Sequence, residues 1–400
     1  MKLALIVAGP LAVEEALFAR TFLEQLPPDH EALVICHTTL AYYLVEDVTN
    51  PDTCRWLLCP YNEAADRDRV AHYIQDFGAE LLVLGDPGAV DSPADRLPSE
   101  WLESLHLPII GLDTGGDVPD LPLQGWLRAC PPGQPGENVV TWQPFGGMEG
   151  ALSRYQMREE LLRRHALPLD TAIVLLPFSL QVQVLAGVRL LGAWYPVMIE
   201  TIAQHLQALG RPVLLVVVTP GCPLAPETRG TVTIAPYHEL VPNLMTRFIA
   251  AADLVLVEQA WRYWRYRALA QGLPVALISN SVVWHEEELR PWTLFGPLLP
   301  PMTALVERLL QAAPHALFPF NNFPQPIEDW RPDAYDPTQA WARLDLFDTA
   351  SCLDVLTKLL SPDEQPHWQA AGLAFLAPGK GATTLGRALG SFLATTSQTR

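Results

Sequence analysis

Short apolar runs alternate with longer amphipathic segments through the first part of the chain. Continuous apolar runs separated by helical segments are typical of parallel strands that are covered on both faces. Buried strands are expected at Leu3–Ala8, Ala32–Cys36, Arg55–Cys59, Leu81–Leu84 and Ile109–Leu112. Helices are expected at Val13–Gln25, which two prolines follow, and at Glu63–Phe77, which ends before a glycine.

The same alternation starts again after Leu121–Gly150, a segment rich in Pro and Gly that breaks the periodicity. The second set of strands is expected at Ala172–Leu176, Val213–Val218, Val232–Ile234, Leu254–Val257 and Val275–Ile278. Helices are expected at Tyr195–Leu209, Glu239–Ala251 and Trp261–Ala270. This repeated pattern predicts an α/β protein of two facing, doubly wound, Rossmann-like domains with a cleft between them.

The length of 400 residues also favours two domains, because single cores rarely grow so large. We expect an N-terminal domain over residues 1–166, a second domain over 167–345 and a helical C-terminal tail over 346–400. The helix predicted at Ala151–His165 closes the first domain in this division.

The composition limits the kinds of molecule that this protein is expected to bind. Apolar residues make up 49% of the chain, which allows large cores, and the net charge of −18 argues against nucleic acid. The six cysteines show no metal-ligand spacing and are expected to be buried free thiols. The N-terminus is interpreted as a strand rather than a leader, and no apolar run is long enough for a membrane span, so a cytoplasmic protein is expected.

The stretch Thr231–Ser281 runs strand, helix, strand, helix, strand with almost no connecting residues. Its segments ADLVLV at 252–257 and ALAQGLPV at 268–275 resemble the GT-B fold glycosyltransferases, above all the branch of the peptidoglycan N-acetylglucosaminyltransferases. The resemblance implies that the first domain takes the acceptor and the second the nucleotide-sugar donor. That donor is a co-substrate, and neither a cofactor nor a metal is implied.

In that family, loops at the carboxyl ends of the second domain's strands hold the donor nucleotide. In this chain the residues expected to bind the donor are Ser179, Tyr237, His238, Leu240, Glu258, Gln259, Arg262 and Arg265. Tyr237 would stack on the base and backbone groups near Leu240 would read its edge. The other interpretation of this loop is that Glu239 only stabilises the start of the next helix.

The turn after Leu254–Val257 departs from the family, because Gln259 and the residues after it replace a Gly-rich turn, and the family's ribose-binding acid is missing near Tyr266. Arg262 and Arg265 share one face of the helix that follows. Guanidinium groups bind phosphate oxygens, and a helix N-terminus adds positive charge, so both arginines are candidates for the diphosphate. The alternative is that the surrounding aromatic residues pack as core and the arginines pair with carboxylates.

Transfer with inversion needs a base that removes the proton of the acceptor hydroxyl. Glu14, Glu15 and His37 are the candidates, because they follow the first two predicted strands. The alternative is structural: the two glutamates are first-turn acids favoured by the helix dipole, and His37 is a loop residue. Asp86 also follows a predicted strand, in the turn expected at Gly85–Gly88.

The leading hypothesis is transfer of a sugar from a nucleotide-diphosphate donor to a small-molecule, lipid or peptide acceptor. Because the Gly-rich turn and the ribose acid are missing, a second hypothesis is a protein of the same fold that has lost catalysis and serves as a binding or assembly partner of another protein. A third is a sugar-nucleotide epimerase on the same architecture.

Overall fold

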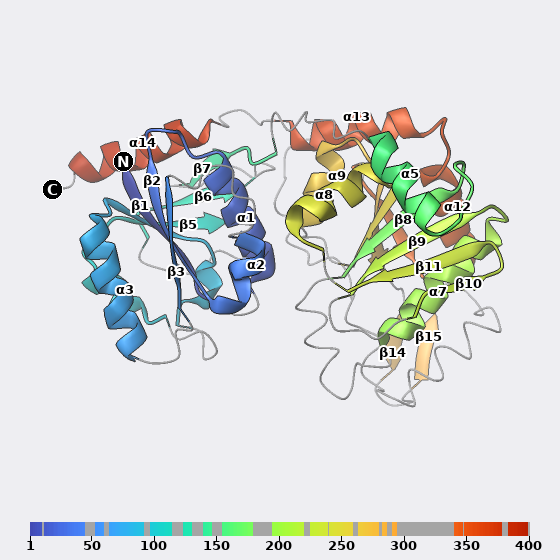
Figure 1. Cartoon of the computed structure of the whole chain (residues 1–400), viewed down its shortest axis with the longest axis horizontal. Helices are drawn as coiled ribbons and strands as arrows, with labels where there is room; N and C mark the ends of the chain where they lie inside the picture. The colour runs from blue at the N-terminus through green and yellow to red at the C-terminus, as the bar shows by residue number, and fades with distance from the viewer. Residues whose placement is uncertain are drawn as a thin grey trace. The chain divides into compact units, whose positions relative to one another are not determined.

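The computed structural model describes residues 1–9, 12–44, 53–59, 64–91, 97–113, 123–129, 139–145, 154–178, 194–219, 225–238, 240–258, 263–279, 282–285, 290–293, 340–346, 348–377 and 383–398. The chain forms two compact units, one from Met1–Gly146 together with Ala377–Arg400, and one from Gly147–Leu376. Each unit is built on its own seven-stranded sheet (Figure 1).

The sheet of the first unit is parallel throughout, with the strand order β3-β2-β1-β4-β5-β6-β7. Its strands are β1 (Lys2–Val7), β2 (Glu31–Cys36), β3 (Cys54–Leu58), β4 (Leu81–Leu84), β5 (Ile109–Asp113), β6 (Gly125–Ala129) and β7 (Val139–Trp142). The order reverses between β1 and β4, which is the topological switch point of a Rossmann-like sheet.

Helices cover both faces of this sheet. They are α1 (Val13–Glu24), α2 (Ala41–Leu44), α3 (Ala64–Phe77), α4 (Ser99–Ser104), α14 (Leu385–Gln398) and the short 3₁₀ helices η1 (Thr38–Leu40) and η2 (Pro87–Ala89). Side chains of α3 and α4 pack with β1, β2 and β4 in one core cluster. Helix α14, red in Figure 1, ends the chain yet lies with the first unit, where Thr383 pairs with Trp142 of β7.

The sheet of the second unit has the order β10-β11-β9-β8-β12-β13-β16, and only β10 runs antiparallel to its neighbour. Its strands are β8 (Ala172–Pro177), β9 (Val213–Val218), β10 (Glu227–Arg229), β11 (Val232–Tyr237), β12 (Leu254–Val257), β13 (Val275–Ser279) and β16 (Ala342–Asp345). Strands β14 (Val282–His285) and β15 (Arg290–Thr293) form a separate hairpin. The switch point lies between β8 and β12.

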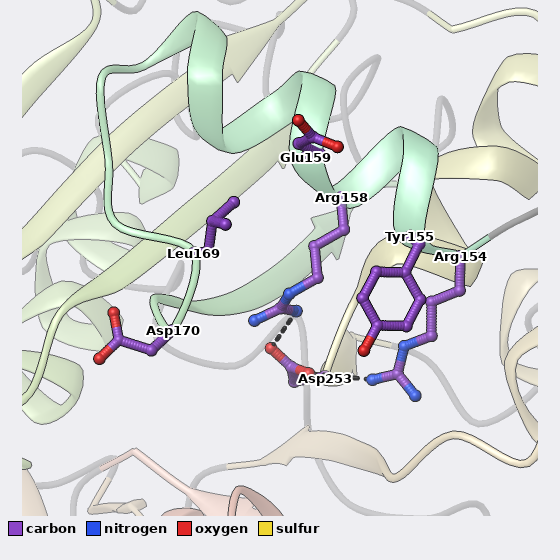
Figure 2. Close-up of a pocket in the computed structure, with 7 residues that line it drawn as sticks. All are labelled: Arg154, Tyr155, Arg158, Glu159, Leu169, Asp170 and Asp253. Carbon is purple, nitrogen blue, oxygen red and sulfur yellow. Dashed lines mark hydrogen bonds and ion pairs between the residues drawn. The ribbon is translucent and has the colours of Figure 1, made fainter.

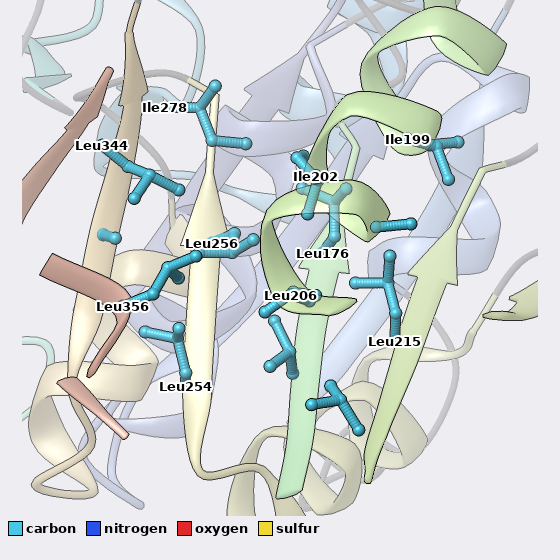
Figure 3. Close-up of a cluster of buried hydrophobic side chains, with 14 of the residues drawn as sticks. Leu176, Ile199, Ile202, Leu206, Leu215, Leu254, Leu256, Ile278, Leu344 and Leu356 are labelled. Atoms are coloured by element: carbon cyan, nitrogen blue, oxygen red, sulfur yellow. The ribbon is translucent and has the colours of Figure 1, made fainter. Parts of the chain in front are cut away.

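The helices of the second unit are α5 (Arg154–Arg164), α7 (Trp194–Ala208), α8 (Pro242–Ala251), α9 (Tyr263–Ala270), α12 (Thr349–Leu359) and α13 (Gln365–Leu376). Figure 3 shows how α7 and α12 cover one face of the sheet with leucine and isoleucine side chains, among them Ile202 and Leu356. Helix α5, which the sequence analysis assigned to residues 1–166, packs against α8 in this unit.

The predicted α/β architecture is confirmed, with differences at the segment ends. The Pro- and Gly-rich segment expected to be irregular contains β6 and β7. Strand β11 continues through Pro236 to Tyr237. Within the described residues β10 pairs only with Val232–Ile234, so the missing N–H of Pro236 breaks no described ladder.

The described cysteines, Cys36, Cys54, Cys59 and Cys352, are free and buried as expected. Across the described ranges, no helix combines the length and apolar character that a membrane crossing requires.

Candidate functional site

The carboxyl ends of β1 and β4 flank the switch point of the first sheet, where Rossmann-like domains bind ligands. Asp86 follows β4 at this edge and is buried. Its Oδ1 accepts a hydrogen bond from Ala8 N at 3.0 Å, and its Oδ2 accepts one from Gly9 N at 2.5 Å. Asp86 therefore holds the chain where it leaves β1, which fits a structural role better than a chemical one.

Glu14 and Glu15 occupy the first turn of α1, immediately beyond that exit. Both side chains are partly exposed. Burial raises the pKa of Glu15 to about 7, and repulsion from Glu14 adds to this rise against an opposing backbone hydrogen bond. A carboxyl that titrates near neutrality can both take and return a proton at that pH.

His37 follows β2 and lies beside the same exit, because its backbone N–H donates to Val7 O at 2.9 Å. The partly exposed ring caps η1, with Nδ1 accepting from Thr39 N at 3.2 Å and lying 2.8 Å from Thr39 Oγ1. The parallel strands thus bring all three predicted base candidates to one edge of the first sheet.

At the corresponding edge of the second sheet, several of the described side chains contact their own unit. Tyr237 ends β11 rather than lying on a loop, and its ring meets Phe248 edge to face at 4.9 Å. Its hydroxyl is 3.3 Å from His165 Nε2 at the end of α5. His238 is exposed and Leu240 is buried. The Tyr237 ring is therefore engaged by its own unit, and its stacking on a base stays a prediction.

Two charged residues near the end of β12 are also buried. Glu258 is 2% exposed and Arg265, on α9, is 0% exposed. The Arg265 guanidinium carbon lies 4.4 Å from the centre of the Trp341 ring and 4.6 Å from that of Tyr266. This placement favours the packing interpretation of Arg265. Ser179, Gln259 and Arg262 lie outside the described residues.

A further feature, which the sequence analysis did not identify, lies at the amino ends of β8 and β12. Asp253 precedes β12 and forms ion pairs with two arginines of α5 (Figure 2). Its Oδ1 lies 3.0 Å from Arg154 Nη2, and its Oδ2 lies 2.7 Å from Arg158 Nη1. A pocket of about 510 Å³ opens beside this ion-pair cluster. The i,i+4 spacing of the two arginines was the available signal, but their partner lies more than ninety residues away.

Comparison with known proteins gives a match to a described protein family. Residues 119–375, more than half of the chain, match the model of a family described as "Family of unknown function (DUF6365)". A search of the curated proteins gives no match.

Several solved structures share the whole fold at low identity. A glycosyltransferase from Rickettsia africae ESF-5 is 9% identical over 98% of this chain and 97% of its own, with a TM-score of 0.52. Arabidopsis thaliana UGT89C1 complexed with UDP-L-rhamnose is 10% identical over 98% of both chains, with a TM-score of 0.55. The spinosyn rhamnosyltransferase SpnG is 13% identical over 98% of this chain and 99% of its own, at 0.51. The predicted GT-B fold is confirmed.

Proposed function

The chain belongs to the DUF6365 family of unknown function, and we propose that it transfers a sugar from a nucleotide-diphosphate donor to a hydroxyl group of an acceptor. The observation that carries the proposal is the position of Glu15, a partly exposed carboxyl in the first turn of α1 at the exit of β1, where burial raises its pKa to about 7. The structure of UGT89C1 with UDP-L-rhamnose supports a nucleotide-sugar as the donor class on this fold.

In the proposed reaction, the Glu15 carboxylate accepts the proton of the acceptor hydroxyl. The hydroxyl oxygen then forms a bond to the anomeric carbon of the sugar, and the bond from that carbon to the diphosphate oxygen breaks. The products are the glycosylated acceptor and a nucleoside diphosphate. Asp86 supports the step indirectly, because it fixes the backbone from which α1 and Glu15 start.

On the donor side, we assign the diphosphate to a position beside the carboxyl ends of strands β8 and β12. A helix N-terminus favours phosphate there, and Arg262 and Gln259 remain the proposed side-chain contacts. Arg265 is assigned to packing beneath this edge, because its guanidinium is enclosed by aromatic rings. Metal-independent transfer belongs to the same proposal.

The test is an assay of nucleoside diphosphate release from UDP-, GDP- and dTDP-sugars, with water or added alcohols as acceptors. Glu15→Gln keeps the shape of the side chain and removes the proton acceptor, so we expect turnover to fall about a hundredfold or more. Glu100→Gln is the matched control, since Glu100 is an exposed first-turn acid of α4. Equal rates in the wild type and Glu15→Gln would contradict the role of Glu15.

A second candidate is a nucleotide-binding or assembly protein without transfer activity. The observation that favours it is that Tyr237 and Arg265, two of the expected donor-binding residues, contact their own unit. Ligand-dependent thermal stabilisation separates the two candidates. Stabilisation by a nucleoside diphosphate without turnover of any nucleotide-sugar favours a nucleotide-binding protein, whereas no stabilisation by any of them contradicts the transferase and favours the assembly protein.

A further inference from the structure

The pocket beside α5 lies at the amino edge of the second sheet, the opposite edge from the proposed donor site. It has a volume of about 510 Å³, within the range of sites for small organic ligands. Its lining residues are Arg154, Tyr155, Arg158, Glu159, Leu169, Asp170 and Asp253 (Figure 2).

The floor of the pocket is preorganised. Asp253 accepts hydrogen bonds from Ile173 N at 2.8 Å and from Arg158 Nη1 at 2.7 Å, and Arg158 Nη2 donates to Thr171 O at 2.6 Å. These bonds tie α5 to the first residues of β8 and β12. The floor therefore needs no ligand to form, and it keeps the neighbouring Arg154 in place through the shared carboxylate.

The walls expose large apolar surfaces. Tyr155 is 85% exposed and Leu169 is 67% exposed, the highest values among the large apolar side chains that the structure describes. They come from α5 and from the segment before β8, on different sides of the ion-pair cluster in Figure 2. Two such side chains around a concave site favour a ligand with an apolar body.

The two ends of the pocket carry opposite charge. Figure 2 shows Arg154 at one end and Asp170 at the other, with Arg158 and Asp253 between them. The Arg154 side chain is 44% exposed, and only its Nη2 is engaged by described residues. Asp170 is exposed and has no ion pair within the described part of the chain. A complementary ligand carries an anion at one end and a cation at the other.

We propose that this pocket binds a short peptide with free termini, of about dipeptide size. Its carboxylate pairs with Arg154, its ammonium group pairs with Asp170, and its apolar side chains lie against Tyr155 and Leu169. Arginine binds carboxylates through paired N–H donors, which gives the peptide one orientation.

Calorimetric titration with three probes tests the proposal: the dipeptide Leu-Phe, its N-acetyl derivative and its C-terminal amide. We expect Leu-Phe to bind at millimolar concentration or below, and each blocked end to weaken binding roughly tenfold through loss of one charged contact. Absence of Leu-Phe binding, or equal binding of all three probes, would overturn the proposal.

Variants assign the contacts. Asp170→Asn is expected to weaken Leu-Phe but not the N-acetyl derivative, and Tyr155→Ser is expected to weaken both. Glu160→Gln is the control, because Glu160 is an exposed acid of α5 that does not line the pocket. These residues are exposed, so the variants should fold, which far-ultraviolet circular dichroism checks. Weakening by Glu160→Gln as large as by Asp170→Asn would show a general charge effect and contradict the assignment.

Discussion

The two units have the same strand order around their switch points, but their carboxyl edges differ in chemistry. The edge of the first sheet holds partly exposed titratable groups, Glu15 and His37. Among the described residues at the edge of the second sheet, Glu258 and Arg265 are almost fully buried, although His238 is exposed. The shared topology therefore fixes where the strands end, whereas side-chain packing decides which charged groups at each edge are accessible.

The units also differ in how pH acts on them. Burial raises the pKa of Glu15 in the first unit, while in the second unit burial lowers the pKa of His205 on α7. His205 is buried, with Nε2 2.9 Å from Leu346 O. The two groups should therefore weaken their units at opposite ends of the pH range.

The largest expected effect comes from Arg265→Ala. The change leaves a cavity between Trp341 and Tyr266 and removes two cation–π contacts, so unfolding of the second unit should become easier by about 3–4 kcal/mol. Denaturant unfolding measures this, with the exposed Arg163→Ala as control. If Arg265→Ala left stability unchanged and abolished nucleotide binding, Arg265 would be a ligand-binding residue. The proposed difference between the carboxyl edges of the two sheets would then be wrong.

Glu15→Gln should change the stability of the first unit next. The pKa of Glu15 lies above its ordinary value of 4.5, so the folded state holds the proton more tightly than the unfolded state. Its contribution to stability falls as pH rises from about 4.5 to about 7. Because the carboxyl is partly exposed, we expect the variant to be more stable than the wild type by about 1–2 kcal/mol at pH 8. Thermal unfolding at pH 4 and pH 8 should show the difference only at pH 8.

His205→Gln should change how the stability of the second unit depends on pH at the acidic end of the range. The pKa of His205 lies below 6.5, so the unfolded chain binds a proton that the folded unit does not, and stability is lost as pH falls below 6.5. The variant should cost about 1 kcal/mol at pH 8 through altered packing and hydrogen bonding, but should lose less stability on acidification. A steeper acid dependence than in the wild type would contradict a neutral buried histidine.

Gly390→Ala should give the smallest effect and sharpen the division into units. Gly390 lies in α14, and a methyl group there would meet nothing within 4 Å. Alanine favours helix over glycine, so we expect a gain of about 0.5–1 kcal/mol. Calorimetry should place this gain in the transition that Glu15→Gln also shifts, because α14 belongs to the first unit. A gain in the transition shifted by Arg265→Ala would contradict that division.

The local pattern predicted the central strands of both sheets, because continuous apolar runs of four to six residues leave few alternatives. It missed β6, β7 and the extension of β11 to Tyr237, since these depend on which neighbouring strand each residue meets. The strand ends correctly identified Glu15 as a residue at the edge of the first sheet. Its raised pKa arises from burial, which only the folded arrangement supplies.

The Asp253 cluster shows the same limit more clearly. From the sequence alone, helical spacing puts Arg154 and Arg158 on the solvent-facing side of their helix. Asp253 is a polar residue that precedes a strand. Nothing local joins them, because the contact depends on α5 packing beside α8. Long-range ion pairs of this kind follow from the packing of whole helices, which sequence periodicity does not encode.

The most direct test of the account is a carbon-13 NMR titration of the Glu15 side-chain carboxyl in the wild-type protein, assigned by comparison with Glu15→Gln. The account predicts a midpoint near pH 7. A midpoint near the ordinary value of 4.5 would leave Glu15 a simple first-turn acid and contradict its proposed part in proton transfer.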